Sequence, residues 1–233
     1  MNFFSLIAQL WPLAIGAAIS PSITVICFAL LQGPNGRRRV FAFWVGAASA
    51  LLVWAILVSS FMWRFVQSLG GELEDATHIL SRYERLLDLV LGSLLIAIGI
   101  LRLLRRPTTK KKVHNRFSIS DLKDGPLRRQ VTFGAIVQGR NVTSILMFIA
   151  AQQSIVASEI ADWQKVATTL IVIGVATSSI WLVLVTPQHW TDKTGGWLSP
   201  IKDWMQHNAR YVEVAAAFGI GTYLIIRSLI GSI

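Results

Sequence analysis

Cysteine and carboxylate side chains are both scarce in this chain of 233 residues. The single cysteine, Cys27, has no partner in the chain, which excludes an intrachain disulfide and a cysteine metal cluster. The four histidines share no ligand spacing, so we expect neither a metal ion nor a cofactor. A Gly-x-Ser-x-Gly elbow, a phosphate-binding glycine loop and paired catalytic carboxylates are also missing, which argues against an enzyme.

Apolar residues, by contrast, make up 53% of the chain and charged residues only 15%. This composition is too apolar for a soluble domain and predicts an integral membrane protein. The net charge of +10 is typical of nucleic-acid binding, but the basic residues cluster beside apolar runs. Positive-inside topology and contact with anionic membrane lipids therefore explain the charge better than a nucleic-acid partner.

Six stretches are long and apolar enough to cross a bilayer as helices, which takes about 20 residues each. The first is not preceded by Lys or Arg, so we expect a retained span rather than a cleaved signal peptide. Residues 64–81 read as a short exposed loop, 107–130 as a basic linker and 187–208 as an interfacial amphipathic segment. The predicted spans are residues 4–31, 40–63, 83–104, 131–156, 166–185 and 211–230.

Two of these spans are interrupted at matching places. Ser20-Pro21-Ser22 breaks the first, and Gly139-Arg140-Asn141 breaks the fourth. Weaker similarities link the second span to the fifth and the third to the sixth, in the same order. We therefore predict an all-α integral membrane protein whose six transmembrane helices form two inverted three-helix repeats. Residues 1–106 would be the first repeat, 107–130 a basic cytoplasmic linker and 131–233 the second repeat, with both termini outside the cytoplasm.

Paired broken helices in a secondary transporter indicate a binding site near the middle of the membrane. Arg140 is the strongest candidate, since a guanidinium suits a carboxylate, phosphate or sulfate, and such a cation is expected to face an interior cavity. A structural ion pair with Asp88 or Glu84, or a side chain that reaches the interface, would also explain it. The predicted substrate-binding residues are Ser20, Pro21, Ser22, Thr24, Gln138, Gly139, Arg140 and Asn141. For the serines and threonines, hydrogen bonding between helices is an equally good explanation.

Asp88 lies inside the third span, at a depth where an acid is either paired or coupled to proton movement. We predict it as the coupling residue, with a salt bridge to Arg85, Arg140 or a neighbouring helix end as the alternative. Arg227, near the far end of the last span, reads as an interfacial anchor. The small residues Gly46, Gly92, Gly174 and Gly219 permit close helix packing or a homodimer, and the sequence leaves both open.

Three segments resemble one known family. Ile19-Ser20-Pro21, the run from Gly33 to Ala47, and Phe133-Gly134-Ala135 followed by residues 138–141 look like the GAP/Sap family. These glycolipid- and sulfolipid-addressing membrane proteins belong to the lysine-exporter (LysE) superfamily. Residues 138–141 stand where the family has Asn-Pro-Lys-Asn, and only Asn141 is kept.

The resemblance implies a transporter or exporter in a bacterial cytoplasmic (inner) membrane. Its cargo would be a small anionic or zwitterionic molecule or a polar lipid, moved by alternating access around the two broken helices. The alternative function is a membrane-embedded accessory protein for lipid export or assembly, without transport of its own. The departures from the motif leave the cargo open.

Overall fold

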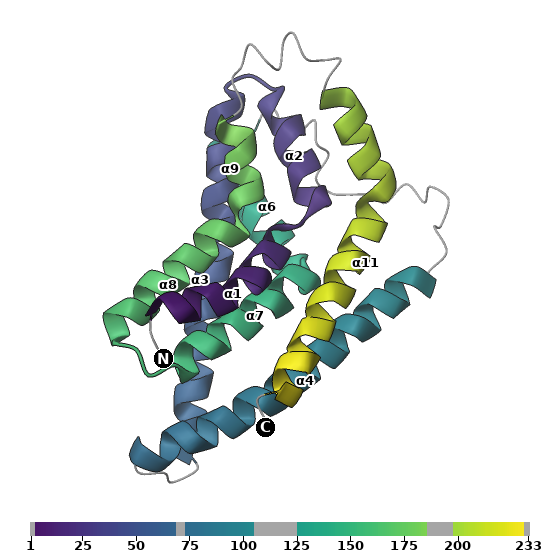
Figure 1. Ribbon diagram of the computed structural model, residues 1–233. Coiled ribbons are helices and arrows are strands. Elements are labelled where there is room, and N and C mark those ends of the chain that lie inside the picture. The colour runs from purple at the N-terminus through teal and green to yellow at the C-terminus, as the bar shows by residue number, and fades with distance from the viewer. Residues whose placement is uncertain (1–2, 69–72, 105–124, 186–197, 231–233) are drawn as a thin grey trace.

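A computed structural model describes residues 3–68, 73–104, 125–185 and 198–230, and all of its regular structure in these residues is helical (Figure 1). The helices in chain order are α1 (Phe3–Ala18), α2 (Pro21–Leu31), α3 (Gly36–Ser68), α4 (Leu73–Leu104), α6 (Leu127–Arg140), α7 (Val142–Ala157), α8 (Asp162–Ala176), α9 (Ser178–Val185) and α11 (Leu198–Ile230).

Three of these helices are long and apolar enough to cross a membrane alone, over Gly36–Phe65 in α3, Arg85–Leu104 in α4 and Arg210–Ile230 in α11. The other helices form three bent pairs, α1 with α2, α6 with α7, and α8 with α9, with bends of 59°, 77° and 59°. The described chain therefore has three candidate spans, or up to six if each bent pair is one span. Large apolar side chains such as Ile56, Leu101 and Leu182 are exposed, as expected for a surface that faces lipid.

The boundaries of several segments differ from the sequence prediction. The predicted loop at residues 64–81 is wrong, because α3 continues to Ser68 and α4 already begins at Leu73. Once a helix has formed, each further residue adds a backbone hydrogen bond, so α3 and α4 extend past their apolar runs. Residues 198–208 are the first part of α11 rather than a separate interfacial piece, and residues 186–197 lie outside the described residues. Of the predicted linker, 127–130 belong to α6 and 107–124 lie outside the described residues.

Helix α7 lies at the centre of the described fold and packs against α1, α3, α4 and α8. Its side chains are almost all buried between Thr143 and Ile155. One apolar cluster surrounds it and includes Leu10 of α1 and Phe148 of α7. A second cluster joins α2, α3 and α9 through residues such as Cys27 and Phe43.

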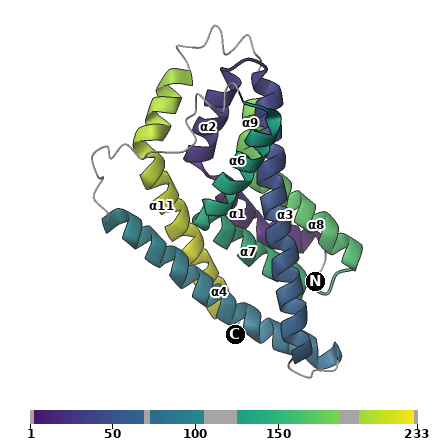
Figure 2. The ribbon, with the colours of Figure 1, turned by 180° about the vertical axis from the view of Figure 1, so that it is seen from behind.

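Glycines set the closest helix contacts. Helices α3 and α6 lie side by side (Figure 2), and a Cβ built on Gly46 would come 1.9 Å from the carbonyl oxygen of Val131. A Cβ on Gly134 of α6 would likewise come 2.1 Å from the carbonyl oxygen of Phe43. Only glycine fits at such backbone contacts, so small residues here serve packing within the chain.

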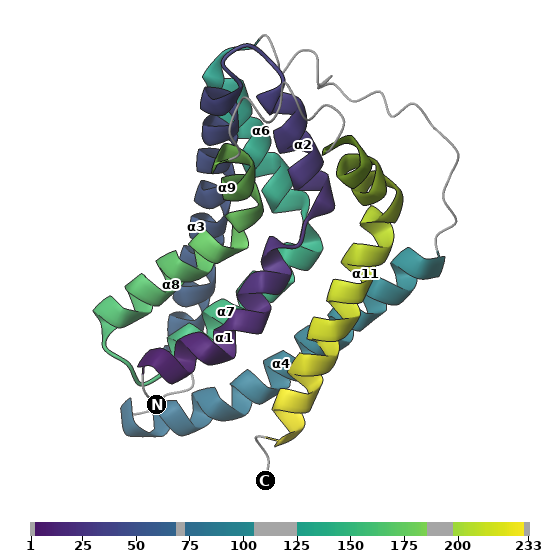
Figure 3. The same ribbon diagram turned by 45° about the horizontal axis from the view of Figure 1, so that its top comes forward.

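A second close pair is α4 and α11, which run together apart from the other helices (Figure 3). Gly92 and Gly221 face each other, since a Cβ on either would lie within 3 Å of the other's carbonyl oxygen, at 2.7 and 2.9 Å. By contrast, a Cβ at Gly174 or Gly219 would meet no atom within 4 Å. Packing within the chain therefore explains Gly46 and Gly92 but neither Gly174 nor Gly219.

Candidate functional site

The first break lies where the sequence predicts it, between the end of α1 at Ala18 and the start of α2 at Pro21. Proline disfavours helical geometry in the residue before it, and Ser20 is extended, with φ −136° and ψ 90°. Proline also has no N–H group. In a continuous helix the N–H of residue 21 would bond to the carbonyl oxygen of Ala17, so Pro21 removes the normal donor for that carbonyl.

The second break lies at Asn141, between α6 and α7, and it also confirms the sequence prediction. Asn141 has φ −80° and ψ 76°, outside the helical region. Its side chain caps α7, because Oδ1 accepts a hydrogen bond from the backbone N–H of Ser144 at 3.4 Å. Asn141 thus ends one helix and stabilises the start of the next.

Hydrogen bonds join these two breaks directly. The hydroxyl of Ser144 donates to the carbonyl oxygen of Ala17 at 2.8 Å, so it replaces the donor that Pro21 removes. The side-chain amide of Asn141 donates to Oγ of Ser20 at 3.1 Å. Gln138, which is buried, donates from Nε2 to Oγ of Ser144 at 3.1 Å. Residues from the two predicted halves therefore form one connected polar cluster, which we call the crossing cluster: Ala17, Ser20, Gln138, Asn141 and Ser144.

Four helix ends meet at the crossing cluster. Helices α2 and α7 begin there, and α1 and α6 end there. The start of a helix carries partial positive charge and its end partial negative charge, so this point offers both signs to a ligand. The Thr143 hydroxyl is buried beside the second break, and within the described part of the chain it has no hydrogen-bond partner. Such a hydroxyl is available to a bound molecule.

The remaining predicted binding residues lie around this cluster. Arg140 is in the last turn of α6, where a cation suits the helix end, but its side chain is exposed. The expectation that Arg140 is buried was therefore wrong, and no residue of the described ranges pairs with it; its role in binding stays a prediction. Gly139 is exposed and faces open space. Thr24 donates locally to the carbonyl oxygen of Ser20 at 3.2 Å.

One charged group beside the first break was missed by the sequence analysis. Glu213 of α11 forms an ion pair with Arg102 of α4, and its other carboxylate oxygen accepts from the Ser22 hydroxyl at 3.4 Å. A signal was present in the sequence, because an acid and an arginine inside two apolar spans need a partner. This contact ties α2 to the α4 and α11 pair.

Asp88 forms a buried ion pair with Arg227, whose Nε lies 2.8 Å from Oδ2 of Asp88. Asp88 is 2% exposed, and Arg227 also donates from Nη2 to Oγ of Ser154 at 2.7 Å. The salt-bridge alternative for Asp88 is confirmed, with its partner on α11 rather than Arg85 or Arg140. The prediction of Arg227 as an interfacial anchor was wrong, since the helix packing turns it inward. Through Ser154 the pair connects α4 and α11 to the central helix α7.

A third break, between α8 and α9 at Thr177, was not predicted. Thr177 is buried, and its hydroxyl donates to the carbonyl oxygen of Ile173 at 2.8 Å. Its Oγ1 also accepts a hydrogen bond from the indole N–H of Trp44 on α3 at 3.0 Å. This bend therefore depends on a tertiary contact as well as on the local sequence.

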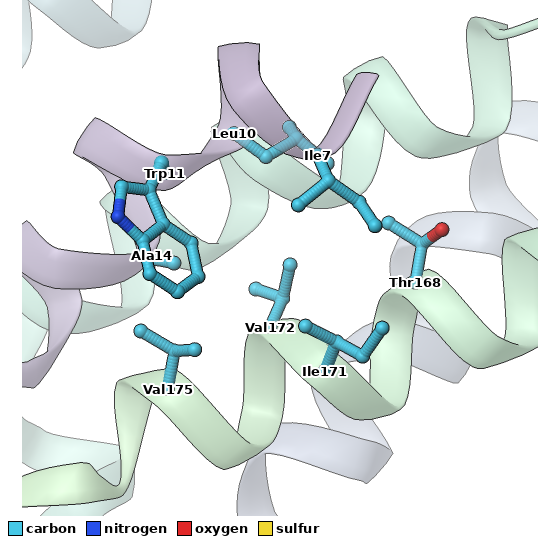
Figure 4. A pocket seen from close by; sticks show the side chains of 8 residues that line it. All are labelled: Ile7, Leu10, Trp11, Ala14, Thr168, Ile171, Val172 and Val175. Carbon is cyan, nitrogen blue, oxygen red and sulfur yellow. The ribbon is translucent and has the colours of Figure 1, made fainter. Parts of the chain in front are cut away.

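Helices α1 and α8 leave a small apolar gap between them (Figure 4). It holds about 10 Å³, close to the volume of one water molecule. Its one hydroxyl, on Thr168, already donates to the carbonyl oxygen of Gln164 at 2.7 Å. The gap is too small and too apolar to be the site of a polar cargo.

Comparison with known proteins places the chain in a family. No curated protein and no solved structure matches it. A family model described as Sap, sulfolipid-1-addressing protein, matches residues 10–229, nearly the whole chain, including both breaks and all the spans described above. This multi-pass helical membrane protein therefore belongs to the Sap (sulfolipid-1-addressing protein) family.

Proposed function

We propose that the protein is a secondary transporter that exports a small anionic or zwitterionic molecule or a polar lipid across a bacterial cytoplasmic membrane. The observation that carries this proposal is the direct contact between the two helix breaks, in which Ser144 bonds to Ala17 and Asn141 bonds to Ser20. Broken helices are tolerated inside a membrane only where protein or water covers the freed backbone groups. In transporters, such breaks surround the cargo.

The two halves of the chain would move against each other around this contact. Residues 1–106 and 131–233 each begin with a broken helix and end with a long one, α4 or α11. An inverted repeat of this kind relates the halves by a two-fold axis in the membrane plane, and rocking about that axis exposes the centre to each side in turn. The bonds of the crossing cluster hold one conformation together, and a cargo that replaces them would favour the other.

The chemistry of the crossing cluster suits a cargo that carries negative charge. The starts of α2 and α7 attract an anion, and the buried Thr143 hydroxyl offers a further hydrogen bond. Arg140 would supply a full positive charge from the exposed end of α6. A zwitterion would also use the negative ends of α1 and α6. In this proposal the cargo is moved without chemical change, so the protein is not an enzyme.

Asp88 is the proposed proton-coupling residue. Its ion pair with Arg227 is buried, and Arg227 in turn bonds to Ser154 of α7. Protonation of Asp88 would remove the charge that holds Arg227 and so loosen the contact between the α4 and α11 pair and the central helix. The energy source would then be a proton gradient.

The test is lipid and metabolite profiling of source cells that carry the wild-type protein, no protein, or a variant at matched membrane levels. We expect Arg140→Ala and Thr143→Val to retain inside the cell the same anionic compound that the deletion retains. Arg128→Ala removes an exposed arginine from the other end of α6 and should behave as wild type. If the deletion has a phenotype while both site variants behave as wild type, the accessory function replaces the transporter.

A further inference from the structure

A groove on the outside of the α3 and α6 pair is separate from the crossing cluster. Its walls are apolar side chains of three helices, Phe41 and Val45 of α3, Leu127 and Val131 of α6, and Leu184 of α9. The groove holds about 560 Å³, within the usual range for a ligand site. Phe41 and Leu127 are 49% and 48% exposed, so the groove opens outward rather than toward the centre of the protein.

Two arginines close one end of this groove. Arg37 and Arg38 line it and are exposed, and they stand at the start of the α3 membrane span, which begins at Gly36. From Arg37 to Val45 the helix rises about 12 Å, a distance that separates a charged end from an apolar end. The groove thus has the polarity of a lipid molecule, with a cationic mouth at the end of the span and apolar walls along it.

The charge around the mouth is positive and lacks local compensation. Arginines follow one another in the first turns of both helices, Arg37 to Arg39 in α3 and Arg128 and Arg129 in α6, and no acid lies in either first turn. Cations at the start of a helix oppose the partial positive charge there, so this arrangement costs stability unless an anion is near. Arg39 is held by backbone carbonyls of Pro34 and Gly125, which keeps the two helix starts together.

We propose that this groove binds an anionic phospholipid of the surrounding membrane, with the phosphate against Arg37 and Arg38 and an acyl chain along the apolar walls. Basic pockets between helices at the end of a span are known to hold anionic headgroups. The charge at the mouth selects against a neutral lipid, and the apolar walls select against a free anion. The site does not depend on the proposed transport, because none of its residues belongs to the crossing cluster.

The experiment is native mass spectrometry of the purified full chain in mild detergent, titrated with phosphatidylglycerol or phosphatidylcholine. We expect the wild type to prefer phosphatidylglycerol. Each arginine near an anionic lipid contributes roughly fivefold to binding, so R37Q/R38Q should weaken phosphatidylglycerol about thirtyfold. The matched control R128Q/R129Q removes the same charge at the same end but not from the groove, and it should stay within about threefold of wild type, because exposed charges farther from the lipid are screened. Val45→Trp should also lose the lipid, since it fills the groove and leaves both arginines.

Three results would overturn the proposal. Equal losses in the two double variants would mean that only the overall charge of this end matters. No loss in either variant would mean that the groove holds another occupant, such as residues 105–124 of the same chain. Competition by inorganic phosphate at equal concentration would mean that the arginines hold a free anion rather than a lipid. Thermal unfolding of every variant without lipid shows whether a loss of binding is a loss of folding.

Discussion

The exchange of donors at the first helix break makes a specific prediction about two residues far apart in the sequence. Pro21 has no N–H for the carbonyl oxygen of Ala17, and the hydroxyl of Ser144 bonds there instead, across 127 positions. If this account is right, Ser144→Ala should be more harmful in the wild-type chain than in a Pro21→Ala chain. Alanine at position 21 restores the N–H and lets residue 20 become helical.

The expected size follows from the bonds that are lost. Ser144→Ala leaves the Ala17 carbonyl and the Gln138 amide without partners in a buried region. An unsatisfied buried group costs about 1–3 kcal/mol, whereas hydrogen bonds between membrane helices average about 0.6 kcal/mol. We therefore expect Ser144→Ala to lower the free energy of unfolding by about 2 kcal/mol. In the Pro21→Ala background the loss should be smaller by about 1 kcal/mol, the coupling energy of the pair.

The assay is reversible unfolding of the purified protein in mixed micelles, with all four members of the double-mutant cycle. Ser49→Ala is the matched control, because its exposed hydroxyl bonds only within its own helix, to the carbonyl oxygen of Val45 at 2.7 Å. It should change the free energy of unfolding by less than about 0.5 kcal/mol. If the effects of Pro21→Ala and Ser144→Ala add to within about 0.3 kcal/mol, Ser144 does not compensate for the proline and our account of the crossing fails.

Three further substitutions test other contacts by the same unfolding assay. Asp88→Asn should cost about 3–5 kcal/mol because it leaves Arg227 buried without its counter-charge, and Asp88→Leu with Arg227→Met should cost less than Asp88→Asn; a loss under 1 kcal/mol, roughly a surface pair's worth, would contradict this. Gly46→Ala should strongly reduce the yield of folded protein, since its methyl group would lie 1.9 Å from a backbone oxygen, whereas Gly174→Ala faces open space and should stabilise by about 0.5–1 kcal/mol; similar yields would disprove the close contact. Trp44→Phe should cost about 1 kcal/mol through the lost indole bond to the third break, and an unchanged protein would show that this bond does not hold the bend.

Sequence reasoning succeeded where a residue acts on its own backbone. Pro21 and Asn141 mark the first two breaks because one lacks an N–H and the other caps a helix through its side chain. The third break escaped because Thr177 is not a helix breaker by itself, and the bend is stabilised by the indole of Trp44 from another helix. A contact of that kind depends on the packing of α3 and cannot be read from a local pattern.

The pairing of charges shows the same limit. The sequence indicates that Asp88 needs a partner, but the choice among arginines depends on how the helices rotate about their axes. That rotation brings Arg227 inward and leaves Arg140 exposed. The glycine contacts between α4 and α11, at Gly92 and Gly221, fix this rotation. Packing of small residues therefore decides which charged residues meet.

The bond from Ser144 to the Ala17 carbonyl also has a consequence for synthesis of the protein. A ribosome adds about 5–20 residues per second, so the donor is made about 6–25 s after its acceptor. During that interval the carbonyl cannot rest in hydrocarbon, where a lone backbone group costs several kcal/mol. The first helix pair must therefore stay beside water or the insertion machinery until α7 arrives. Membrane insertion of this chain is completed in its second half, and a nascent chain stopped before residue 144 should remain accessible to water-soluble reagents at the first break.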